Sequence, residues 1–155
     1  MQKLTNLEET LENAERKCSL RGKKLTRKRK QILRALLETK SALSAYELMS
    51  LCNKNTSKPM PPMSVYRILE FLRIEKLAHK LETTNKYIAC AHIACNHKHV
   101  ESQFLICNDC HRVEEIDVSS EALSAVEAAA NKADFKLLNT QLEVSGVCNI
   151  CAVGA

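Results

Sequence analysis

The chain has 155 residues and a net charge of +5, which suits one ordinary domain or two small ones. No apolar run approaches the roughly 18 residues of a membrane span, and the first residues lack the apolar stretch of a signal peptide. We therefore expect a cytoplasmic protein that does not bind membranes. Eight cysteines in such a chain are poor disulfide candidates because the cytosol is reducing, so metal binding is their expected use.

Charge is divided unevenly along the sequence. Residues 1–80 carry 18 Lys/Arg against 8 Asp/Glu, a net +10, and residues 81–155 carry 5 against 10, a net −5. A basic first half predicts contact with a polyanion, while the acidic second half must have a different task.

The first half has the pattern of helices. Thr5 and Glu8 fit a capping box, which predicts a helix that runs to about Cys18. Thr26 can cap a second helix, because four aliphatic side chains follow it at helical spacing. Those four residues are Ile32, Leu33, Leu36 and Leu37.

Two more helices and a hairpin are expected before residue 90. Ser44 and Glu47 form a second capping box. Residues 53–62 have the composition of a loop, and Pro62 then opens a helix. The apolar face of that helix consists of Val65, Ile68, Leu69 and Leu72. Residues 77–89 contain two short extended runs around 82–85, which predict a hairpin.

The second half has the pattern of an α+β domain. Residues 102–106 and 113–118 are strand-like, and residues 120–133 form an Ala-rich helix with Leu123, Val126 and Ala130 on one face. Leu138, Thr140, Leu142 and Val144 alternate at period two, which predicts a further strand.

The first half has the order of a winged helix-turn-helix: a short helix, a connection, a second helix and a hairpin. Residues 16–34 hold ten Lys/Arg and no acid, which favours DNA through counterion release, although charge runs alone are usually solvated. Side chains at the helix starts can donate to phosphates or base edges. The DNA-contact candidates are Arg27, Tyr46, Ser64, Tyr66 and Arg67.

Two CxxC pairs lie in the second half, Cys107 with Cys110 and Cys148 with Cys151. Two such pairs complete a closed tetrahedral zinc site, and four occupied positions leave no place for a substrate. The site should therefore be structural. A redox role for a single CxxC is the minority alternative, because two pairs occur in one small domain.

A second group of possible ligands surrounds the first CxxC. It contains His79, Cys90, His92, Cys95, His97, His99, His111, Glu114 and Glu115. This mixture suits Zn(II), with Cu or Co possible by intrinsic affinity. His99 and Glu101 before a CxxC also resemble part of a zinc deaminase motif. That alternative is disfavoured, because only seven residues separate His99 from Cys107, no proline precedes Cys107, and the second CxxC is left unexplained.

Taken together, these motifs resemble the ferric uptake regulator family of metal-dependent repressors, most closely its zinc uptake regulator branch. The resemblance covers nearly the full chain. The segments that carry it are residues 21–26, Ser44-Ala45-Tyr46-Glu47-Leu48, Val65-Tyr66-Arg67-Ile68-Leu69, His79-Lys80-Leu81-Glu82, Asn85-Lys86-Tyr87-Ile88-Ala89-Cys90 and both CxxC pairs. Two departures are Ser64, where the family usually has Thr, and His111, where it usually has Gly.

The resemblance implies a winged-helix DNA-binding domain over 1–82, a hinge over 83–91, and an α/β dimerisation domain over 92–155. It implies structural zinc on Cys107, Cys110, Cys148 and Cys151. It also implies a sensing zinc whose ligands match His79, Cys90, Glu115 and a histidine before the first CxxC. His99 is preferred for that position, with His97 as the alternative.

The predicted function is therefore a zinc-responsive repressor of zinc-uptake genes, and not an enzyme. It would bind two Zn²⁺ per chain and double-stranded operator DNA as a homodimer, with no small-molecule substrate. The alternative is an iron- or peroxide-responsive repressor of the same architecture, for which the soft ligand Cys90 would be a poor choice.

Overall fold

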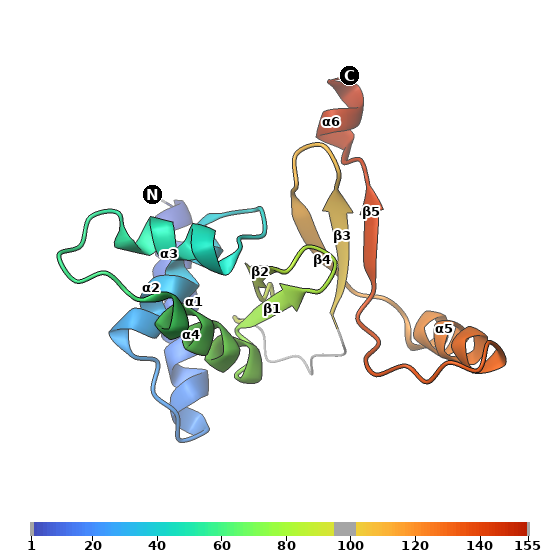
Figure 1. The fold of residues 1–155 in the computed structure, drawn as a ribbon, viewed down its shortest axis with the longest axis horizontal. Helices are drawn as coiled ribbons and strands as arrows, with labels where there is room; N and C mark the ends of the chain where they lie inside the picture. The colour runs from blue at the N-terminus through green and yellow to red at the C-terminus, as the bar shows by residue number, and fades with distance from the viewer. Residues whose placement is uncertain (1, 95–101, 155) are drawn as a thin grey trace. The chain divides into compact units, whose positions relative to one another are not determined.

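The computed structural model describes residues 2–94 and 102–154. It divides into two compact units, residues 1–97 and 98–155, which are treated separately below (Figure 1). The domain and hinge limits expected from the sequence remain a prediction. Within the described residues, no helix combines the length and apolar character that crossing a bilayer requires. Four candidate residues lie outside the described ranges: Cys95, His97, His99 and Glu101.

The first unit consists of four helices followed by a hairpin. The helices are α1 (Gln2–Leu20), α2 (Arg27–Glu38), α3 (Ala45–Asn53) and α4 (Pro62–Ile74). Strands β1 (Ala78–Leu81) and β2 (Lys86–Ala89) then pair antiparallel, with Ala78 opposite Ala89. The predicted winged helix-turn-helix order of elements is confirmed, with α1 added in front of it.

Local sequence determines where three of these helices begin. The Thr26 hydroxyl accepts a hydrogen bond from the Arg29 N–H. In the Ser44 capping box, the Glu47 N–H donates to the Ser44 hydroxyl at 3.2 Å and the Ser44 N–H donates to the Glu47 carboxylate at 2.6 Å. Pro62 is the first residue of α4, where its missing N–H costs no hydrogen bond. All three predicted starts are confirmed.

The predicted capping box at Thr5 is wrong. Helix α1 begins at Gln2, so Thr5 lies inside the helix rather than before it. The Glu8 carboxylate, which was expected to bind back to the cap, instead lies 2.6 Å from the guanidinium of Arg34 on α2. A tertiary ion pair thus uses the side chain that the local motif required.

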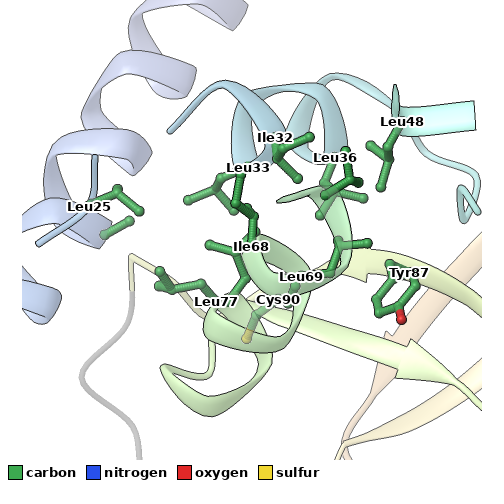
Figure 2. Close-up of a cluster of buried hydrophobic side chains, with 14 of the residues drawn as sticks. Leu25, Ile32, Leu33, Leu36, Leu48, Ile68, Leu69, Leu77, Tyr87 and Cys90 are labelled. Carbon is green, nitrogen blue, oxygen red and sulfur yellow. The ribbon is translucent and has the colours of Figure 1, made fainter. Parts of the chain in front are cut away.

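Aliphatic side chains from all four helices meet in one core (Figure 2). Ile32, Leu33 and Leu36 of α2 lie fully buried. Leu11, Ala14 and Cys18 cover them from α1, at spacings that place all three on one helical face. The hairpin joins this body through Leu43, whose backbone N–H and C=O both pair with Tyr87 of β2, at 2.9 and 2.7 Å. The hairpin therefore has a fixed position on the helical body.

The second unit is a three-stranded sheet with two helices. Its elements are β3 (Gln103–Cys107), β4 (Val113–Ile116), α5 (Ser120–Lys132), β5 (Glu143–Gly146) and α6 (Asn149–Val153). The sheet order is β4-β3-β5, with β3 antiparallel to β4 and parallel to β5. Figure 1 shows α6 directly after β5, at one end of the sheet. The predicted α+β class is confirmed.

The expected strand from Leu138 to Val144 is only partly correct, because β5 begins at Glu143. The preceding segment is held by a side chain. The buried amide of Gln103 donates to the Thr140 carbonyl at 2.9 Å and accepts from the Leu142 N–H. The backbone groups at 140 and 142 are thereby bound outside a continuous ladder. A period-two pattern alone does not reveal that a side chain, in place of a neighbouring strand, binds these backbone groups.

Little of the second unit is buried. Among its described residues, the buried ones are Gln103, Phe104, Cys107 and Val113. Helix α5 buries none of its side chains. Large apolar side chains are exposed instead: Leu105, Val126, Phe135, Leu138, Val144, Val147, Ile150 and Val153. A domain this poor in core needs another source of stability, such as a metal or a partner chain.

Candidate metal centre and nucleic-acid interface

The four predicted zinc ligands of the second unit come together. Cys107 ends β3, Cys110 lies in the turn to β4, Cys148 caps α6 and Cys151 lies within α6. Their sulfur atoms all lie within 4.8 Å of one another. The register explains the meeting, because the parallel pairing of β3 with β5 places Cys107 beside Gly146, two residues before Cys148.

Electrostatics in this cluster favour a bound cation. The backbone N–H groups of Cys110 and Cys148 point at the Cys107 sulfur and lower the pKa of Cys107 to about 6. Hydrogen bonds to the sulfurs of Cys148 and Cys110 raise the pKa of Cys151 to about 12. The cluster therefore favours ionisation of the Cys107 thiol and disfavours ionisation of the Cys151 thiol. A divalent cation removes that conflict, because it lets all four sulfurs ionise.

His111 occupies the residue position directly after the first CxxC. Its φ is 60°, in the left-handed region, and its N–H donates to the Cys107 carbonyl at 3.0 Å. Glycine adopts this conformation without steric cost, whereas an L-residue does not. The turn therefore suits glycine, and this chain accepts the strain of an L-residue there.

Two of the predicted sensing ligands lie close together in the first unit. His79 is on β1 and Cys90 directly follows β2, and a ring nitrogen of His79 lies within 4.8 Å of the Cys90 sulfur. Cys90 is only 2% exposed, and its N–H donates to the Leu77 carbonyl at 3.0 Å. The hairpin itself makes this pair, because Ala78 lies opposite Ala89 and each ligand follows one of these two residues.

The remaining sensing ligands stay predictions. Glu115 belongs to β4 in the second unit, where it accepts a hydrogen bond from the Ser102 hydroxyl. His97 and His99 lie outside the described residues.

The candidate DNA contacts are distributed over three helices of the first unit. Arg27 is the first residue of α2, and Tyr46 is exposed near the start of α3. Ser64, Tyr66 and Arg67 lie in the first turns of α4, opposite the buried face formed by Val65, Ile68, Leu69 and Leu72. Met63 is exposed on the same turns and was not selected from the sequence. Their role in DNA binding remains a prediction.

Several cations of the basic segment 16–34 already have partners within the protein. Lys30 lies 2.6 Å from the Glu15 carboxylate, and Arg34 is paired with Glu8. The guanidinium of Arg29 stacks over the Phe71 ring at 3.6 Å. Sequence reasoning missed these pairings, because the acids are 15 and 26 residues away along the chain. The segment therefore offers fewer available charges than its composition indicates.

Comparison with known proteins gives consistent results. The model of the ferric uptake regulator family matches residues 20–145. The zinc uptake regulation protein of Escherichia coli (strain K12) is 34% identical over 147 residues, covering 95% of this chain and 84% of that protein.

Two solved structures are also similar. A zinc uptake regulator in complex with zinc and DNA has a TM-score of 0.83 and 30% identity, with 96% of each chain covered. A structure described as holo XcZur has a TM-score of 0.76 and 35% identity, covering 92% of this chain and 96% of that one.

Proposed function

This chain belongs to the ferric uptake regulator family, and on that basis we propose that it is a zinc-responsive repressor that switches off zinc-uptake genes. Family membership makes it a transcription regulator rather than an enzyme. The proposal places it in the cytoplasm, bound to operator DNA as a homodimer with two zinc ions per chain.

The observation that carries the proposal is the division of its ligands into two different sets. Four cysteine sulfurs within 4.8 Å of one another suit a closed, permanent zinc site. The pair His79 and Cys90 supplies one nitrogen and one sulfur, a combination that suits Zn(II) better than Fe(II) or Mn(II). The similar structure with zinc and DNA supports the same assignment.

In the proposed sensing site, His79 and Cys90 from the first unit and Glu115 from the second bind one zinc with His99 or His97. Two neutral imidazoles, one thiolate and one carboxylate balance the charge of Zn²⁺. A zinc ion held by both units would select one angle between them, a population shift driven by metal affinity. Zinc and DNA would then strengthen each other's binding by the same factor.

DNA reading is assigned to α4, with Ser64 and Arg67 one turn apart near its start. Arg67 would reach a guanine edge or a phosphate, while Ser64, Tyr66, Tyr46 and Arg27 would donate to phosphates. Two-fold symmetry would place a second copy of α4 about 34 Å away, or at a multiple of that distance.

The second unit supports the homodimer. The large exposed apolar side chains of this unit, which include Val126 of α5 and Val144 of β5, outnumber its buried residues in the described part of the chain. A surface of this kind is typical of an obligate interface, which resembles a domain core cut in half. Burying it against a second copy would supply the core that the unit lacks alone.

The test is a zinc titration of the purified protein in a chelator-buffered series, reading bound metal per chain and affinity for promoter DNA. We expect two classes of zinc, with DNA binding following only the weaker one. One tight zinc per chain, with DNA binding indifferent to more zinc but activated by Fe(II) or Mn(II), would overturn the zinc assignment.

A further inference from the structure

A basic groove of about 760 Å³ lies in the first unit between α2 and the connection from α3 to α4. Figure 1 shows that connection as the loop between α3 and the start of α4. Five basic residues line the groove together with polar residues of the loop, and none of its lining residues is acidic. The basic residues are Arg27, Lys28, Lys30, Arg34 and Lys58.

The wall of the groove is held in place by hydrogen bonds. The amide of Gln31 donates to the Cys52 carbonyl at 2.9 Å, which joins α2 to the end of α3. Asn53 then closes the loop with two bonds to Met60, accepting from its N–H at 2.8 Å and donating to its carbonyl at 3.0 Å. Lys58 lies inside this closed loop, and its N–H donates to the Thr56 hydroxyl. Lys58 is therefore carried by a loop whose conformation is held by hydrogen bonds.

The five cations are not equally available. Glu15 and Glu8 of α1 neutralise Lys30 and Arg34, each at 2.6 Å. In the described part of the chain, Arg27, Lys28 and Lys58 have no such carboxylate partner. Three unpaired cations facing one groove repel each other, and an anionic ligand would relieve that repulsion.

We propose that this groove binds the sugar–phosphate backbone of DNA, and that the two α1 carboxylates set its strength by neutralising two of its five cations. This inference rests on the proposed DNA-binding function and adds Lys28 and Lys58 to it as phosphate contacts. Asn55, Thr56 and Ser57 supply further donors that fit phosphodiester oxygens.

Continuity with α4 favours duplex DNA over a small free anion. The loop that carries Lys58 ends at Met60, and α4 begins two residues later at Pro62. A stretch of DNA backbone that passes the first turns of α4 would therefore also pass this loop. The volume also exceeds what one phosphate group fills, and contacts to successive phosphates would position the helix without reading sequence.

The experiment compares Lys28→Gln and Lys58→Gln with the native zinc-loaded dimer. Affinity is measured by fluorescence anisotropy over a range of salt concentrations, for an operator duplex and for an unrelated duplex. We expect each variant to bind both duplexes more weakly by the same factor. The slope of log K against log salt should fall by about 1 per lysine. Lys40→Gln, an exposed lysine outside the groove, is the matched control.

Removing either α1 carboxylate should have the opposite effect on DNA affinity. Glu8→Gln and Glu15→Gln should each free one groove cation, so that DNA binds more tightly and the salt slope steepens by up to about 1. Thermal melting and zinc content confirm that every variant is folded and loaded.

The inference is overturned if the Lys28 and Lys58 variants match the Lys40 control, or if the two glutamate variants leave affinity and slope unchanged. Failure of the proposed function would look different, because the native protein itself would then show no zinc-dependent binding to the operator.

Discussion

The guanidinium of Arg21 lies 3.3 Å from the carboxylate of Glu75, which links the residue after α1 to the residue that ends α4. The Glu75 side chain is only 3% exposed, while that of Arg21 is 54% exposed. One Glu75 oxygen makes no hydrogen bond among the described residues. Arg21 is therefore the cation that compensates a buried negative charge.

Removing Arg21 should destabilise the first unit. In Arg21→Gln the Glu75 carboxylate stays buried without its cation, and we expect a loss of about 1–3 kcal/mol in the free energy of unfolding. The measurement is urea denaturation followed by circular dichroism. Lys23→Gln, an exposed cation two residues away, is the control and should change stability by less than about 0.5 kcal/mol. Equal effects of the two changes would remove the structural role of the ion pair.

The four-cysteine cluster should stabilise the fold itself. Cys107→Ser removes one ligand of the proposed structural zinc site, and the affinity of such a site for its metal contributes directly to folding. We expect loss of the tight zinc and a much lower melting temperature or loss of the dimer, read by metal analysis and by sedimentation. Cys52→Ala is a useful comparison, because Cys52 is buried in the helical core of the first unit and does not belong to this ligand set. A stable zinc-free Cys107 variant that still represses would contradict the assignment.

Cys90 should behave differently from Cys107. Cys90→Ser and His79→Ala each remove one proposed sensing ligand and leave the four-cysteine cluster intact. We expect a folded dimer with one zinc per chain whose DNA affinity no longer responds to added zinc. Isothermal titration with zinc, followed by anisotropy with operator DNA, measures both effects. Unfolding of these variants would show instead that the site is structural.

The strained turn after the first CxxC offers a stabilising change. His111 has a φ of 60°, so His111→Gly should relieve the left-handed strain and stabilise the second unit by about 1 kcal/mol. The measurement is the melting temperature of the zinc-loaded protein. Asp109→Gly serves as the control, because Asp109 is not among the residues with positive φ and glycine there only adds chain entropy. A lower melting temperature for His111→Gly would show that the imidazole has a role of its own.

The first unit should lose stability in acid through Glu47. A backbone hydrogen bond from Ser44 holds the pKa of Glu47 below its ordinary value of 4.5, with help from Lys86 at 3.2 Å. A carboxylate with a lowered folded pKa contributes stability above its unfolded pKa and loses it as pH falls through the folded value. We therefore expect stability to decline below about pH 4.5. Glu47→Gln should flatten that decline in melting curves between pH 3 and 6, and an unchanged slope would rule this contribution out.

Features that depend on neighbours in sequence were predictable, and those that depend on distant residues were not. The caps at Thr26 and Ser44 are local, since donor and acceptor lie three residues apart. The CxxC pairs are similar, because spacing within each pair already forces two sulfurs together. By contrast, the Thr5 capping box is wrong because α1 already begins at Gln2, and Glu8 pairs instead with Arg34, 26 residues away. The late start of β5 has the same kind of cause, because Gln103 binds Thr140 across 37 residues.

The candidate site follows the same division. The hairpin could be read from its turn, and it brings His79 and Cys90 together. Which histidine completes that set could not be read, because His97 and His99 are both suitable ligands and differ by only two positions. The sequence also does not reveal which cations of the groove are neutralised, because their pairing depends on how α1 packs against α2.

The parallel pairing of β3 with β5 has a topological consequence. A metal bound by both CxxC pairs would close a ring of chain from Cys110 to Cys148, a separation of 38 residues that contains α5. Ring-closure entropy grows so slowly that doubling the enclosed length costs only about 0.6 kcal/mol. A metal at this site would thus act as a cross-link that fixes both ends of this segment. Closure entropy alone would therefore penalise a longer segment between those ends only slightly.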